Sequence, residues 1–238
     1  MLVLEQAARL CLVTQSDHAR LARDIIALWT GDDLPSRPWR EELLLAVAEH
    51  DNGWREVDSA PLPSADTGWP CDFRHYPEAE KRRIWQLGID RFADQNPPVA
   101  LLLLLHAIRL SQPQQASPAW RTFIDSLQER RLALESLADI DPTALESTCE
   151  FLWLADTLSL GVCGIWGQRR LTWRDYEIVV SPGRLRIDPL PFAGPFKLRV
   201  PCRYLPRLRY SGETELGTEL GAAHWQFLPV SVEAEPRT

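Results

Sequence analysis

The chain has 238 residues, of which 45% are hydrophobic and 25% are charged, a balance typical of a globular protein with a sizeable core. Its formal net charge is −7, and its only lysines are Lys81 and Lys197. An acidic chain without a basic run is a poor candidate for non-specific nucleic-acid binding, because such binding depends on neutralising many phosphates.

The cysteines and the apolar segments indicate a cytoplasmic protein. Five cysteines form an odd set without a CxxC pair, which is typical of reduced, buried thiols. The N-terminus lacks the basic start and the long apolar stretch of a signal peptide. The strongly apolar run from Val99 to Leu105 is too short to cross a bilayer, so we expect no membrane insertion.

The first predicted elements are a hairpin over residues 2–14 and a helix that follows it. Ser16 or Asp17 is placed to cap the first turn of this helix, and Gly31 is placed to end it. Apolar residues recur at helical spacing after Arg40, which predicts a second helix that ends near His50.

Residues 58–78 contain several prolines and few periodic apolar positions, which predicts a long irregular loop. Long loops inside compact domains are often functional. Prolines then punctuate four further predicted helices at positions where a helix start tolerates them. These helices are expected at about 79–94, 98–111, 117–138 and 142–162.

After Gly167 the pattern changes to short strands separated by proline and glycine turns, with a short helix near residues 213–223. The strands are predicted at 176–180, 184–187, 196–200 and 225–230. We therefore predict a mainly α fold, a helical bundle with a small β-rich C-terminal element to which the N-terminal hairpin can add strands. The expected division is a helical domain over 1–167 and a small β-rich tail over 168–238 packed on it.

Four polar residues occupy helix faces that the apolar pattern predicts to be buried: His18, His50, Asp51 and Asp156. A buried carboxylate is costly unless a cation or several hydrogen-bond donors compensate it. No lysine or arginine lies within one helical turn of Asp156, so the compensating charge must come from elsewhere in the fold. Two imidazoles and two carboxylates suit a divalent ion such as Mn, Fe, Zn or Mg. The alternative interpretation is a buried network of helix caps and hydrogen bonds.

The order of these residues resembles the HD superfamily of metal-dependent phosphohydrolases. His18 lies in SDHARLA, the His50–Asp51 pair in EHDNGWRE and Asp156 in ADTLSL, and the resemblance covers roughly residues 16–162. It implies an HD-like helical bundle in which His18, His50, Asp51 and Asp156 hold a metal ion.

Gly53 matches a glycine of the HD motif. Many active HD enzymes have a lysine directly after this glycine, whereas this chain has Trp54. Two-metal enzymes of that family need further histidines, and only His75, His106 and His224 remain, which favours a single ion or an unusual second site involving His106.

The chain also resembles, over nearly its whole length, an uncharacterised bacterial family of proteins with a domain of unknown function. The shared features are QSDHARLA, EHDNGWRE, the His106 helix, LADTLSLGVC and a DPLPF motif at residues 188–192. This resemblance implies a shared fold and brings no activity.

The residue types therefore predict a metal-dependent hydrolase of a phosphate ester, either a nucleotide or another small phosphorylated metabolite. Asp51 would act at the metal, while Glu49 is a candidate general base through water and Arg55 and Arg109 are candidate anion contacts. His106 lies in the apolar ALLLLLHAIRL, where it is either a site residue or a satisfied core histidine.

Two other functions stay open. An HD-type di-iron oxygenase would require His106 and a further histidine such as His75 to complete a second iron site. A metal-stabilised or metal-free ligand-binding or interaction protein would need no catalysis. The ten tryptophans leave a homodimer open as well.

Overall fold

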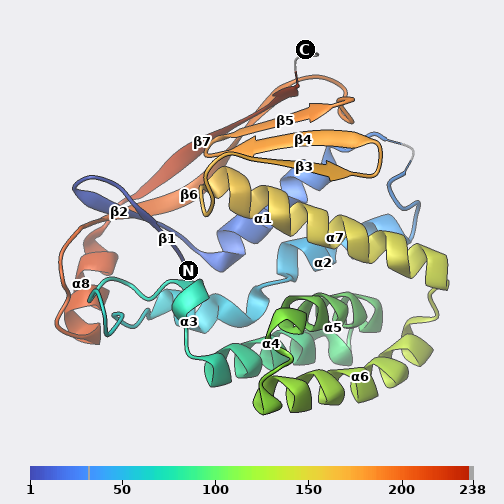
Figure 1. Cartoon of the computed structure of the whole chain (residues 1–238), viewed down its shortest axis with the longest axis horizontal. Coiled ribbons are helices and arrows are strands. Elements are labelled where there is room, and N and C mark those ends of the chain that lie inside the picture. The colour runs from blue at the N-terminus through green and yellow to red at the C-terminus, as the bar shows by residue number, and fades with distance from the viewer. Residues whose placement is uncertain (32, 236–238) are drawn as a thin grey trace.

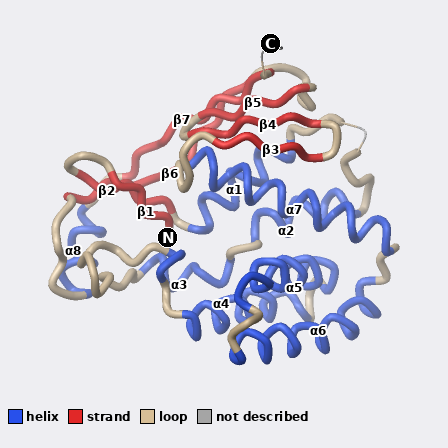
Figure 2. Tube along the Cα trace, in the orientation of Figure 1, coloured by secondary structure: helices blue, strands red, loops and turns tan. Residues whose placement is uncertain are grey.

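The fold is a layer of helices covered on one side by a curled β-sheet, as the computed structural model shows (Figure 1). The structure describes residues 1–31 and 33–235. Helices account for 52% of the chain and strands for 21%. Figure 2 shows that the strands gather along one side of the molecule and that the long helices lie on the other.

The sheet has seven strands in the order β1-β2-β6-β7-β5-β4-β3 and forms a half-barrel. Strands β5 and β7 are parallel, and the other neighbouring pairs are antiparallel. The strands are β1 Leu2–Glu5, β2 Arg9–Val13, β3 Arg169–Trp173, β4 Tyr176–Ser181, β5 Arg184–Asp188, β6 Phe196–Pro206 and β7 Trp225–Ala234.

Helices α1 and α7 pack against the inner face of the sheet, and α2, α4, α5 and α6 lie further from it (Figure 1). Contacts between α1 and α2, α1 and α7, α2 and α5, and α4 and α5 join the helices into one body. The helices are α1 Gln15–Ala27, α2 Trp39–Glu49, α3 Arg55–Ser59, α4 Glu78–Ala93, α5 Pro97–Ser111, α6 Pro118–Ala138, α7 Pro142–Cys163 and α8 Glu213–Ala222, with short 3-10 turns η1 Asn52–Trp54, η2 Phe73–His75 and η3 Gln112–Gln114.

The predicted fold class, a mainly α bundle with a small β element, is wrong, and the fold is not all-α, because the sheet has seven strands. The predicted hairpin and its pairing with the C-terminal strands are confirmed, since β2 pairs with β6. Strand β3 was not predicted, because its sequence RRLTW is mostly polar. The division at residue 167 stays a prediction, although the sheet takes strands from both segments.

The predicted helices are confirmed with small shifts at their ends. The first helix starts two or three residues earlier than expected, since its N-cap is Thr14 rather than Ser16 or Asp17. The Thr14 side chain accepts a hydrogen bond from the backbone N–H of Asp17. In the part of the chain that the structure describes, no helix combines the length and the apolar character needed to cross a membrane.

The long loop before α4 is irregular, as predicted, and is fastened to the edge of the sheet. The carboxylate of Asp72 accepts a hydrogen bond from the N–H of Val3 at 3.0 Å, and the N–H of Phe73 donates to the carbonyl of Met1 at 3.0 Å. These bonds satisfy polar groups at the edge of β1 that no neighbouring strand pairs.

Gly53 explains how η1 packs against α4. A Cβ atom at this position would lie 2.1 Å from the carbonyl oxygen of Ile84, which belongs to the helix backbone and cannot move aside. Gly88 of α4 faces the same contact, where a Cβ would meet the Asn52 amide at 3.2 Å. The glycine after the His–Asp pair is therefore required by close approach of two backbones.

We expect Gly53→Ala to lower the free energy of unfolding by about 1–3 kcal/mol, because overpacking against a rigid backbone displaces η1. Urea denaturation of wild type and variant measures the loss. Gly194→Ala is the matched control, since nothing lies within 4 Å of a Cβ there. Equal stability of the two variants would contradict this account of the contact.

Candidate metal centre

Five polar side chains from four helical segments converge in a buried cluster beneath the sheet. His18 comes from α1, the His50–Asp51 pair follows the end of α2, His106 comes from α5 and Asp156 from α7. None of the five is more than 8% exposed. The helix contacts described above therefore bring together all four predicted ligands and add His106.

The ring nitrogens and carboxylate oxygens form two overlapping groups of three, and within each group the ligand atoms lie within 4.8 Å of one another. One group is His18, His50 and Asp51, and the other is His50, His106 and Asp156. Nε2 of His18 is 3.0 Å from Oδ2 of Asp51, and Nε2 of His50 is 3.6 Å from the same oxygen. On the other side, Nε2 of His50 is 3.3 Å from Oδ1 of Asp156, and Nε2 of His106 is 3.6 Å from Oδ2. A divalent ion binds nitrogen and oxygen ligands at about 2.0–2.2 Å, so atoms at these separations can surround it.

Hydrogen bonds on the far side of two imidazoles turn their free nitrogens toward the carboxylates. Nδ1 of His50 donates to the carbonyl of Val47 at 2.8 Å. The hydroxyl of Ser159 donates to the carbonyl of Asp156 at 2.9 Å, so its oxygen is free to accept from Nδ1 of His18 at 3.0 Å. In each neutral ring the lone pair is then on Nε2, the arrangement that metal-binding histidines adopt.

Two ring nitrogens of the cluster lack a hydrogen-bond partner. Nε2 of His50 and Nε2 of His106 are buried and unpartnered among the described residues. Because an unsatisfied buried polar atom is costly, an ion that binds these nitrogens and displaces the proton of His50 would stabilise the folded chain. The donor set and its unpartnered nitrogens therefore fit a divalent metal ion.

The electrostatics of the cluster also favour a cation. Burial opposes ionisation of Asp51 and Asp156, but the neighbouring histidines outweigh it and lower the pKa of both carboxyl groups. Burial lowers the pKa of His106 to about 4, so this ring is neutral at pH 7. Burial would also lower the pKa of His50, yet the charges of Asp51 and Asp156 raise it to about 9.

The cluster borders a cavity of about 350 Å³. Asp51 and Asp156 form part of its wall, and Lys81 and Arg74 supply its positive charge. Aromatic rings make up much of the remaining surface. They belong to Trp54, Phe73, Trp85 and Trp120.

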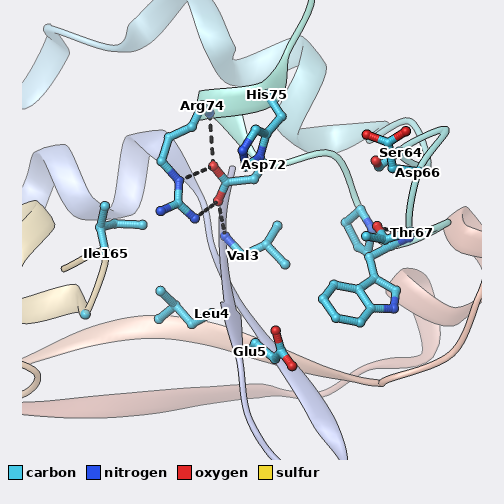
Figure 3. A pocket seen from close by; sticks show the side chains of 13 residues that line it. Val3, Leu4, Glu5, Ser64, Asp66, Thr67, Asp72, Arg74, His75 and Ile165 are labelled. Atoms are coloured by element: carbon cyan, nitrogen blue, oxygen red, sulfur yellow. Dashed lines mark hydrogen bonds and ion pairs between the residues drawn. The ribbon is translucent and has the colours of Figure 1, made fainter. Parts of the chain in front are cut away.

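The other predicted site residues lie outside the cluster. Arg55 and Glu49 form an ion pair with each other, so the roles of general base and anion contact stay predictions. The guanidinium of Arg109 lies over the ring of Trp153, 4.3 Å from its centroid. His75 lines a different cavity of about 470 Å³ beside β1, which it shares with Arg74 (Figure 3).

Sequence reasoning missed several residues at the centre. Ser159 stands three positions after Asp156, on the same helix face, and that spacing was a usable signal. Lys81 and Arg74 gave no signal, because only the folded loop and α4 bring them to the cavity. The same holds for Gln15 and Trp120, which come from α1 and α6.

A family model described as "Protein of unknown function (DUF3891)" matches residues 1–207. No curated protein and no solved structure matches the chain.

We expect the purified protein to hold about one equivalent of a divalent transition metal, and Asp51→Ala and Asp156→Ala to lose it, because each removes a charged ligand. Ser159→Ala should weaken metal affinity 10–100-fold, since the orienting partner of His18 is lost. Elemental mass spectrometry and titration of the metal-free protein measure both effects.

Ser126→Ala is the matched control, because Ser126 makes the same hydroxyl-to-carbonyl bond within a helix far from the cluster. A wild-type protein that binds no metal after reloading with Mn or Fe would contradict the assignment and leave a buried polar network.

Proposed function

The chain belongs to the DUF3891 family of proteins of unknown function, and we propose that it is a metal-dependent hydrolase of phosphate esters. The observation that carries the proposal is a buried set of three imidazoles and two carboxylates beside a cavity with two cationic side chains. The resemblance of SDHARLA, EHDNGWRE and ADTLSL to the HD phosphohydrolases supports the same activity.

His18, His50, Asp51 and Asp156 would hold the ion. His106 lies within ligand distance of His50 and Asp156, so it is a further candidate ligand. A divalent ion bound there lowers the pKa of water and offsets negative charge on a phosphoryl group. Asp51 faces the cavity, so a substrate can approach the centre without rearrangement of the helices.

Lys81 is the better placed of the two cations to bind the phosphoryl group. Arg74 is already neutralised, because its guanidinium forms two hydrogen bonds with the carboxylate of Asp72, at 2.7 and 3.2 Å. Lys81 is half-buried, its ammonium donates to the carbonyl of Arg74 at 2.7 Å, and burial lowers its pKa. We therefore assign the anion contact to Lys81 in place of Arg55 and Arg109.

The arrangement favours one ion over the two that a di-iron oxygenase would need. The two groups of candidate ligands share His50, and this ring has a single free nitrogen, because Nδ1 donates to Val47. His75, which would have to help complete a second site, lines the separate cavity beside β1.

We expect the metal-loaded protein to hydrolyse a phosphate ester, and Asp51→Ala to lower kcat at least 100-fold through loss of the metal. Lys81→Ala should raise KM about tenfold, because it removes the charge that binds the phosphoryl group. A screen of phosphate esters with Mn, Fe, Zn and Mg, followed by steady-state kinetics, measures both effects.

Lys197→Ala is the control, since the other lysine of the chain is exposed on β6 and outside this cavity. A protein that binds metal but turns over no ester with any of these ions would overturn the proposal and favour a metal-stabilised binding protein.

A further inference from the structure

Asp156 forms part of the wall of two separate cavities. One is the cavity of about 350 Å³ that contains Asp51 and Lys81. The other, of about 370 Å³, lies between α7 and strand β3. Leu110 and Leu160 also border both, so the two cavities lie on either side of the same three side chains beside the candidate metal centre.

The first cavity has polar atoms that lack partners as well as aromatic walls. Oε1 of Gln15 and Nε1 of Trp120 are buried, border this cavity and make no hydrogen bond within the described residues. Both atoms are closed to solvent, so an occupant can bind them only if the side chains of Gln15 and Trp120 turn toward the cavity. Trp85 adds an apolar ring to the same wall.

The second cavity is also lined by aromatic and cationic side chains, which come from different residues. Its aromatic walls are Trp153 and Trp166. The guanidinium of Arg169 lies over the ring of Trp166, 4.9 Å from its centroid, and that of Arg109 lies over Trp153. An aromatic surface edged by arginine suits an organic group attached to an anion, since the ring binds the group and the guanidinium attracts the charge.

We infer that the substrate is a phosphodiester, with one organic group in each cavity and the phosphoryl group at the ion that Asp51 and Asp156 would hold. This inference rests on the proposed function. A phosphate monoester has one organic group and would leave one of the two cavities without a role, whereas a diester occupies both from a single phosphorus.

The reaction is a hydrolysis that needs no further reactant. The oxygen of water forms a bond to phosphorus, and one of the two P–O ester bonds breaks. The departing oxygen takes a proton that originates from the water, so the products are one alcohol and one phosphate monoester.

The test compares diphenyl phosphate with phenyl phosphate, by calorimetric binding to the full chain loaded with an ion that gives no turnover and by hydrolysis with an ion that does. A diester spans both cavities, so Trp85→Ala in the first and Trp166→Ala in the second should each weaken its binding about tenfold. Phenyl phosphate should be weakened by only one of the two. The ratio of diester to monoester kcat/KM should fall about tenfold in whichever of the two variants leaves phenyl phosphate unaffected.

Arg169→Ala keeps the test valid if Trp166→Ala does not fold, because the Arg169 side chain is exposed and its loss leaves the core intact. We expect it to weaken diester binding as well. Trp225→Ala is the control, since this ring is 54% exposed on β7 and borders neither cavity.

The outcomes separate this inference from the proposed function. Hydrolysis of the monoester alone would overturn the inference that the substrate is a diester. Diester binding that is unchanged in Trp166→Ala and Arg169→Ala would do the same. Either result leaves the proposed hydrolysis of phosphate esters intact. Turnover of neither ester by metal-loaded protein overturns both. Preferred hydrolysis of the diester with the expected losses in the variants supports the inference.

Discussion

The charge balance of one buried cluster constrains how the helices of this protein meet. Asp51 and Asp156 are buried, and the groups that face them in the cluster are imidazoles rather than arginine or lysine. A buried carboxylate left without a cation would oppose folding. Helices α1, α2 and α5 therefore have to meet α7 with His18, His50 and His106 turned toward the carboxylates. The backbone and Ser159 fix two of those rings.

The site residues that could be predicted from the sequence are those that local helical spacing indicates. His18, His50, Asp51 and Asp156 each interrupt an apolar face, which is unfavourable unless the polar groups meet one another. His106 also interrupts such a face, but a lone histidine has an equal explanation as a satisfied core residue. Only the packing of α5 against α2 and α7 brings its ring beside Asp156.

The sheet could not be predicted in the same way, because its pairing is long-range. β2 pairs with β6, and β5 lies parallel to β7 across the intervening β6 and α8. Strands β1 to β5 have only four to six residues each, so local patterns indicated a small tail. What the sequence lacked was a signal for register, since Cys11 of β2 lies opposite Tyr204 of β6 in a pairing that no local pattern specifies.

Trp54 follows Gly53 and brings no charge to the centre, so on the proposed function the cation that binds the substrate has to come from another element. Trp54 is buried against Tyr76 and borders the cavity beside Asp51. The close packing that Gly53 permits holds η1 against α4, the helix that contributes Lys81 to the same cavity. The Trp54 ring thus forms part of the cavity wall, while Lys81 of α4 supplies the positive charge. This arrangement is compatible with an anionic substrate.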